Sequence, residues 1–135
     1  GNGLTSEVWW SPNHPFSSSL TGVSARELAD GYTKETGKQW TQPIGFRHAL
    51  FEVVADVVSR ADDLDSPESV VAAIAATKLD TMVGPVDWSS GPVKNVSKTP
   101  LVSGQWQKDN GQYDLKIVAN SAAPQIPLTG DLKLL

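Results

Sequence analysis

LDTMVGPVDW, Leu79–Trp88, is the stretch that divides the chain into two kinds of structure. It follows a helical pattern and precedes polar turns and strand-like residues. Proline lacks a backbone N–H and glycine weakens a strand interior, so Gly84-Pro85 interrupts regular pairing. We predict two short strands around this pair, at Met82-Val83 and at Val86–Trp88.

A hairpin is predicted further on, within residues 101–118. Asn110-Gly111 lies between two strand-like runs, Val102–Gln107 and Tyr113–Ala119. Asn-Gly favours the two-residue turn of a hairpin, because both residues tolerate a positive φ. Apolar and polar residues also alternate in the second run, as in a half-buried strand.

Three helices are predicted before the Gly-Pro stretch. The first, Ser24–Thr36, opens with a capping box between Ser24 and Glu27 and stops at Gly37. The third opens at Ser66, an N-cap residue followed by a proline, and runs to Thr77. The second has a wide apolar arc, so we expect deep burial. Its apolar positions recur at helical spacing: Phe46, Ala49, Leu50, Val53, Val54, Val57, Val58 and Ala61.

The two ends of the chain are expected to be extended. Leu4–Trp10 has the composition of a strand, which Pro12 and Pro15 stop. The tail contains Pro124 and Pro127, so we expect it to be extended and weakly ordered.

Composition and charge exclude several classes of function. The chain has 135 residues, a net charge of −4 and no cysteine. Disulfides, zinc–thiolate sites and cysteine nucleophiles are therefore excluded. Without a basic stripe, nucleic-acid binding is not expected. No signal peptide opens the chain, and Gly1-Asn2-Gly3 leads directly into a strand, so we expect a cloned or cleaved fragment.

Motifs that carry chemistry are absent from the sequence. There is no glycine-rich phosphate loop, no His-Glu-x-x-His and no Gly-x-Ser-x-Gly. His14 and His48 stand alone, and we interpret them as structural or solvated. A serine–histidine–acid triad, as in a small hydrolase, stays open as a minor alternative, because such residues meet in space. Asp62, Asp63 and Asp65 lack the spacing of a calcium loop, so we interpret them as a solvated turn. No catalytic residue, metal or cofactor is predicted.

Four of the five tryptophans separate into packing and candidate binding residues, and Trp40 lies just before the long helix. Trp88 and Trp106 lie in strand patterns and are predicted to pack in the core. Trp9 and Trp10 are neighbours on a strand, so their side chains point to opposite faces. One of them is therefore free to form the wall of a ligand site while the other lies in the core.

The order of these segments resembles the C-terminal part of periplasmic solute-binding proteins of ABC transporters, above all the branched-chain amino-acid-binding family. The likeness rests on the first strand, the helix ending in Thr36-Gly37, the helix start Gln42–Ala49, the Asp-Ser-Pro-Glu helix, the Gly84-Pro85 stretch and the hairpin. Two features depart from the family: Phe46 stands where an aromatic alcohol is common, and Trp9–Pro12 is an unusual run.

The resemblance implies an α/β fold of the type I periplasmic binding class, which would look α+β-like in a fragment. The chain would be one partial domain of a two-lobed protein, with residues 1–100 mainly in the N-terminal lobe and residues 101–135 in the C-terminal lobe. It implies a non-catalytic, periplasmic binding component that delivers its ligand to a membrane permease. The expected ligand is a branched-chain or hydrophobic amino acid or an aromatic acid. A ligand-sensing regulatory domain of the same fold is the alternative.

The resemblance also indicates which residues contact the ligand. The family has one cleft residue just before the long helix, which corresponds to Thr41 or Gln42. We add Trp9, Trp10 and Phe46 as wall candidates. A fragment with an apolar stripe left bare is expected to form a homodimer or to exchange elements with a copy of itself. It is also expected to bind nothing measurable alone, because half of the cleft is missing.

Overall fold

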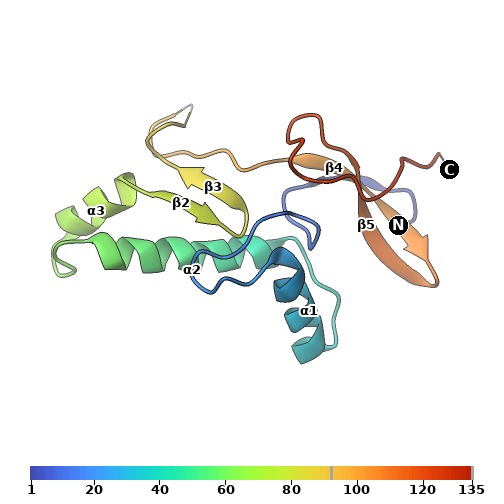
Figure 1. Ribbon diagram of the computed structural model, residues 1–135, viewed down its shortest axis with the longest axis horizontal. Helices are drawn as coiled ribbons and strands as arrows, with labels where there is room; N and C mark the ends of the chain where they lie inside the picture. The colour runs from blue at the N-terminus through green and yellow to red at the C-terminus, as the bar shows by residue number, and fades with distance from the viewer. Residues whose placement is uncertain (92, 135) are drawn as a thin grey trace.

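The computed structural model describes residues 1–91 and 93–134, which form an elongated molecule with a sheet at one end and a long helix at the other (Figure 1). The chain runs through eight elements, and it mixes helices and strands as expected. They are β1 (Thr5–Val8), α1 (Ala25–Thr36), α2 (Pro43–Arg60), α3 (Pro67–Ala75), β2 (Lys78–Thr81), β3 (Gly84–Asp87), β4 (Val102–Asp109) and β5 (Gln112–Ala119).

The larger sheet is antiparallel and has the order β1-β4-β5. The predicted hairpin is present, with Asn110 at φ 47° and Gly111 at φ 86° in its two-residue turn. Positive φ at both positions is the requirement of a type I′ turn. β1 pairs with β4 through Thr5↔Gln105 to Val8↔Val102, so the first strand of the chain shares a sheet with the segment 101–135.

The smaller sheet is the antiparallel hairpin of β2 and β3. The predicted strand at Met82-Val83 is wrong, because these two residues form the turn and Gly84 opens the second strand. Thr81 closes this turn: its Oγ1 donates to Gly84 O at 2.7 Å and accepts from Val83 N at 3.2 Å. The physical reason is tertiary, since the Met82 and Val83 side chains are buried in the core between the helices, and the strands pair on either side of them.

The helix ends follow local sequence signals. Ser24 and Glu27 form the predicted capping box, and Gly37 ends α1 in the left-handed conformation at φ 68°. Ser66 Oγ accepts from Ser69 N at the start of α3. α2 ends at Arg60, one residue before the expected Ala61, where Arg60 and Asp56 form an ion pair of 2.6 Å. Within the described residues, none of the helices has the length and apolarity to cross a membrane.

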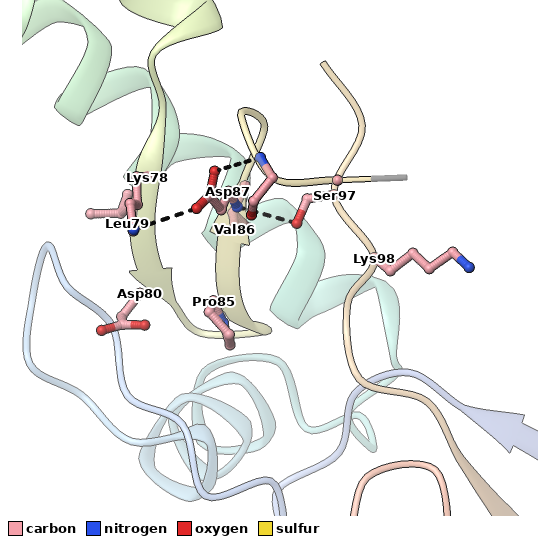
Figure 2. Close-up of a pocket in the computed structure, with 10 residues that line it drawn as sticks. Lys78, Leu79, Asp80, Pro85, Val86, Asp87, Ser97 and Lys98 are labelled. Atoms are coloured by element: carbon pink, nitrogen blue, oxygen red, sulfur yellow. Dashed lines mark hydrogen bonds and ion pairs between the residues drawn. The ribbon is translucent and has the colours of Figure 1, made fainter. Parts of the chain in front are cut away.

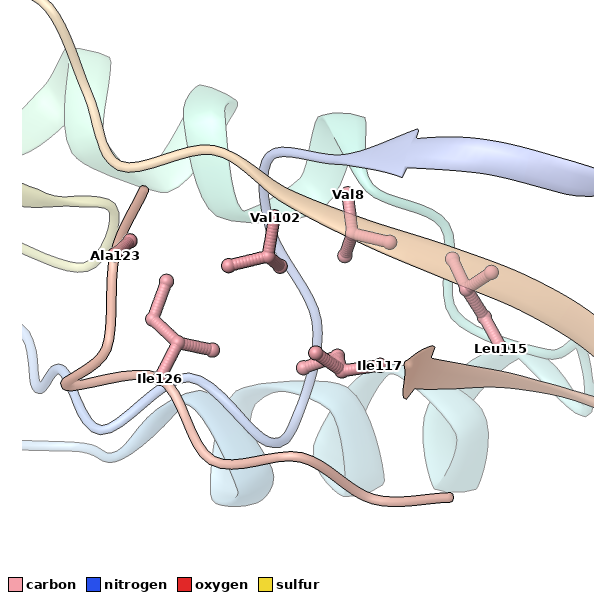
Figure 3. Close-up of a cluster of buried hydrophobic side chains, with 6 residues drawn as sticks. All are labelled: Val8, Val102, Leu115, Ile117, Ala123 and Ile126. Atoms are coloured by element: carbon pink, nitrogen blue, oxygen red, sulfur yellow. The ribbon is translucent and has the colours of Figure 1, made fainter. Parts of the chain in front are cut away.

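Two apolar cores hold the molecule together, and Trp40 packs against both. One core lies on a face of the larger sheet and is closed by the segment after β5 (Figure 3); it comprises Val8, Val102, Leu115, Ile117, Ala123 and Ile126. The other lies between α1, α2 and the β2–β3 turn; it comprises Trp10, Ala25, Ala29, Ala49, Met82 and Val83.

α2 is buried on one side only, contrary to the expectation of deep burial. Its inner side contacts α1, α3 and β2. Its outer side exposes a row of large apolar residues, with Leu50, Phe51, Val54 and Val58 between 48% and 66% exposed. The remaining elements are too short to surround a helix of 18 residues, so the apolar arc seen in the sequence is only half covered.

The C-terminal tail was expected to be extended, but its first part forms turns, with Ala123 N donating to Asn120 O and Ile126 N to Ala123 O. Side chains of β4 hold the part after Gly130 in place. Gln105 Nε2 donates to Lys133 O at 2.9 Å, and Lys133 N donates to Gln105 Oε1 at 2.9 Å. Gln107 Nε2 donates to Asp131 O at 2.8 Å. Both glutamines are buried, and their side-chain amides form the hydrogen bonds with the tail backbone that a neighbouring strand would otherwise form.

Candidate functional site

A shallow apolar hollow of about 570 Å³ lies where β1 ends and α2 begins. It includes two of the aromatic residues that the sequence singles out, Trp9 and Phe46. A mostly apolar concavity with a few polar groups is the usual form of a small-molecule site. The residues lining it are Glu7, Trp9, Pro43, Phe46, Arg47, Leu50 and Leu101.

Gln42 joins the two elements that form the hollow. Its Oε1 accepts from Trp9 N at 2.8 Å and from Trp10 N at 3.3 Å. Its Nε2 donates to Glu7 O at 3.1 Å. All three bonds go to the backbone of residues 7–10, at the end of β1 and just after it, so the Gln42 side chain orients the wall of the hollow and does not line it. Thr41, the other candidate for the cleft position, is exposed beside it and does not line the hollow.

Trp9 and Phe46 form the aromatic wall. Their ring centroids are 5.0 Å apart at an interplanar angle of 75°, an edge-to-face contact. Aromatic rings favour this arrangement, because the positive edge of one ring meets the negative face of the other. Both residues are half-buried, so each ring is fixed on one side and exposed on the other.

Trp10 points the opposite way and is completely buried in the helical core. Its indole lies directly on Gly45 of α2, where a Cβ atom would come within 2.3 Å of the ring. It also meets Trp40 edge to face at 6.0 Å. The predicted strand Leu4–Trp10 is shorter in the structure and ends at Val8, so the pair Trp9-Trp10 divides between surface and core just after β1. Trp10 is a packing residue in this chain.

The hollow carries one positive and one negative side chain, Arg47 from α2 and Glu7 from β1. Both are exposed, and neither forms an ion pair with any residue that the structure describes. Pattern reasoning missed both as binding residues. The feature of the sequence that could have identified Arg47 is its position as a charged residue among the apolar residues of the second helix.

A larger hollow of about 720 Å³ lies beside the β2–β3 hairpin (Figure 2). Two of its four charged side chains, Lys78 and Asp87, are already paired within the protein. Asp87 is 3.6 Å from Lys78 Nζ and accepts from the Ser89 hydroxyl at 2.6 Å, and that hydroxyl is the main cause that lowers the pKa of Asp87. Figure 2 shows the Lys98 side chain directed away from the hairpin. We therefore favour the apolar hollow as the ligand site.

His48 is hydrogen-bonded to a serine, the arrangement that a hydrolase would need. Its Nε2 lies 2.8 Å from Ser18 Oγ. Ser18 is buried, however, and its Oγ already accepts from Leu20 N at 3.2 Å and from Thr21 N at 3.1 Å. The acid one turn along the helix, Glu52, binds the backbone of Ser19 and Met82. We therefore interpret Ser18, His48 and Glu52 as residues that stabilise the turn at residues 18–21.

His14 is a buried structural histidine. Ser11 N donates to its Nδ1 at 3.0 Å, which places the proton of the neutral ring on Nε2. That Nε2 is buried without a hydrogen-bond partner among the described residues, and burial lowers the pKa of His14 to about 4. The described part of the chain also contains no group of three or more histidine or acidic side chains able to hold a metal ion.

Comparison of the chain with family models, curated proteins and solved structures found no match in any of the three.

Proposed function

We propose that this chain is part of a non-catalytic, extracytoplasmic binding protein of the type I periplasmic binding class. In this proposal it contributes one wall of an interlobe cleft for a hydrophobic amino acid, which the whole receptor delivers to a membrane permease. The observation that carries the proposal is the hollow in which the Trp9–Phe46 wall meets Arg47 and Glu7.

The chemistry of the hollow matches such a ligand. The exposed sides of two aromatic rings, with Leu50 and Leu101, offer surface to an aliphatic side chain. The Arg47 guanidinium suits a carboxylate, which it can bind through two parallel hydrogen bonds. Glu7 offers a partner to an ammonium group. A hydrophobic amino acid carries all three features, whereas an aromatic or branched acid without nitrogen leaves Glu7 unused.

The proposal is tested by calorimetry on the protein that carries this chain together with the lobe proposed to precede it. The ligands are leucine, valine, benzoate and 4-methylpentanoate, the leucine analogue without the amino group. Trp9→Ala and Arg47→Gln are expected to weaken leucine binding about tenfold or more, since each removes a principal contact. Glu7→Gln is expected to weaken leucine but not 4-methylpentanoate.

Two controls separate this site from general damage to the fold. Tyr113→Ala removes an exposed aromatic residue from the far end of the larger sheet and should leave affinity unchanged. The 135-residue chain alone is expected to show no measurable binding. Unchanged leucine affinity in both Trp9→Ala and Arg47→Gln would overturn the assignment of this hollow, and tight binding by the isolated chain would overturn the two-lobed cleft.

A further inference from the structure

The outer side of α2 carries an unusual stripe of exposed residues. Arg47, Leu50, Phe51, Val54 and Val58 follow one another at spacings of one to four residues, and all of them are exposed. Only Arg47 is charged. A helix that is apolar on its outer as well as its inner side is typical of a helix covered on all sides.

The stripe is part of a larger apolar surface. Leu50 also lines the hollow, where it meets Phe46, Trp9 and the 45% exposed Leu101. The apolar surface therefore continues from the middle of α2 to the end of β1. Monomeric proteins rarely expose continuous apolar patches of more than a few hundred Å², and larger ones mark contact sites.

Charges of opposite sign stand at the two ends of the stripe. Arg47 lies in the first turns of α2, and the exposed Asp62 and Asp63 follow directly after its last residue. None of the three forms an ion pair within the part of the chain that the structure describes. The helix dipole adds partial charge of the same sign at each end, positive near Arg47 and negative near the two aspartates.

When two copies of α2 pack in antiparallel orientation, the positive end of each stripe lies beside the negative end of the other. Val54 lies seven residues after Arg47 and six before Arg60, the last residue of α2, or about 10 and 9 Å along the axis at 1.5 Å per residue. A two-fold axis through Val54 thus brings the Arg47 of one helix to the C-terminal end of the other, which Asp62 and Asp63 follow directly. The same axis sets Leu50 against Val58, a large residue against a small one.

We infer that the outer side of α2 is a self-association surface, on which a second copy of this chain packs its own α2 in antiparallel orientation about Val54. A parallel pair is disfavoured, because it places Arg47 beside Arg47 and the acidic ends beside each other. The arrangement is isologous, so each pairwise contact occurs twice. The inference rests on this face alone and is independent of the proposed ligand.

Such a dimer also covers the apolar hollow, because Leu50 and Arg47 belong to both surfaces. Self-association through this face would therefore block the approach of a ligand to the hollow.

The first test uses single-cysteine variants, which the absence of natural cysteine makes unambiguous. Val54→Cys is expected to form a disulfide-linked dimer on mild oxidation, because a disulfide needs Cβ atoms about 4 Å apart and position 54 lies on the axis. A mixture of Leu50→Cys and Val58→Cys is expected to cross-link to each other far more than either does to itself. Val71→Cys, equally exposed on α3, is the matched control and should remain monomeric.

The second test exchanges the charges and measures the dimer dissociation constant by sedimentation equilibrium. Arg47→Asp is expected to raise that constant about tenfold, since two symmetry-related pairs are lost together. Arg47→Asp combined with Asp62→Arg and Asp63→Arg should restore it. Because all three residues are exposed, these variants keep the fold.

Either of two results overturns the inference. One is a monomer at every concentration tested. The other is a dimer in which Leu50→Cys links mainly to itself or in which Val71→Cys links as fast as Val54→Cys. Failure here leaves the proposed ligand site untouched, since that site is tested by calorimetry on the two-lobed protein.

Discussion

Glu52 on α2 receives the backbone N–H of Met82, thirty residues later, at 2.8 Å. Its other carboxylate oxygen receives Ser19 N at 2.6 Å and the Ser19 hydroxyl at 3.2 Å. Glu52 is buried, and both backbone donors lie in turns that have no strand partner at those positions. A single carboxylate on the long helix thus fixes the loop before α1 and the β2–β3 turn.

Glu52→Ala is expected to lower the free energy of unfolding by about 1–3 kcal/mol, because it leaves the buried Met82 N–H without an acceptor and removes the bonds from the exposed Ser19. Glu52→Gln should cost less, since it keeps one acceptor oxygen. Urea denaturation measures both. Glu35→Ala, on the exposed side of α1, is the control and should change stability by less than about 0.5 kcal/mol.

Gly45→Ala is expected to destabilise the protein by about 1–3 kcal/mol or more. The added Cβ would lie 2.3 Å from the ring of Trp10, which is fully buried and has no room to move. Gly31→Ala is the matched control within α1, where the new Cβ meets nothing within 4 Å. That change should stabilise the protein by about 0.5–1 kcal/mol, the ordinary helix preference for alanine. Equal effects of the two substitutions in thermal unfolding would contradict the packing of Trp10 on Gly45.

Stability is expected to fall as the pH is lowered from about 6.5 to about 4, through the titration of His14. The folded pKa is about 4 because the ring is buried, against the ordinary 6.5 of an unfolded chain. In that window the unfolded state binds the proton and the folded state does not, so acid favours unfolding. A difference of this size corresponds to at most about 3 kcal/mol.

The His14→Gln variant separates this effect from the titration of carboxylates. It should lose most of the pH dependence between 6.5 and 4 in urea denaturation. An NMR titration of His14 in the folded wild type gives the pKa directly. A midpoint near 6.5 would show that the ring is solvated and that the buried environment is misassigned.

Gln105→Ala is expected to release the C-terminal tail. The Gln105 side chain makes a reciprocal pair of 2.9 Å bonds with Lys133 and a further bond to Gly3 O at 3.1 Å. Without it, the Lys133 amide should exchange its hydrogen about tenfold faster, since each such bond contributes about 1 kcal/mol. Gln112→Ala, exposed at the start of β5, should leave that exchange rate unchanged.

Local signals were sufficient for the ends of α1, for the start of α3 and for the β4–β5 turn. The capping box at Ser24, the left-handed Gly37 and the Asn110-Gly111 turn act through the backbone of a few adjacent residues. The division of Trp9 and Trp10 was predicted from strand geometry, but both residues lie beyond the end of β1, and tertiary packing on Gly45 and Phe46 decides it. The hollow could be located only in part, because Glu7, Arg47 and Leu101 reach it from three separate segments.

The sequence by itself determined three helices, the β4–β5 hairpin and the caps of the first and third helices, since these depend on propensity and on hydrogen bonds between near neighbours. Only the tertiary structure decided that Met82-Val83 is a turn, that Gln42 orients the backbone after β1, and that α2 is covered on one side. The apolar pattern of a helix in the sequence indicates how much apolar surface that helix has for burial. It does not indicate which elements cover that surface, because burial depends on the other elements that pack against the helix.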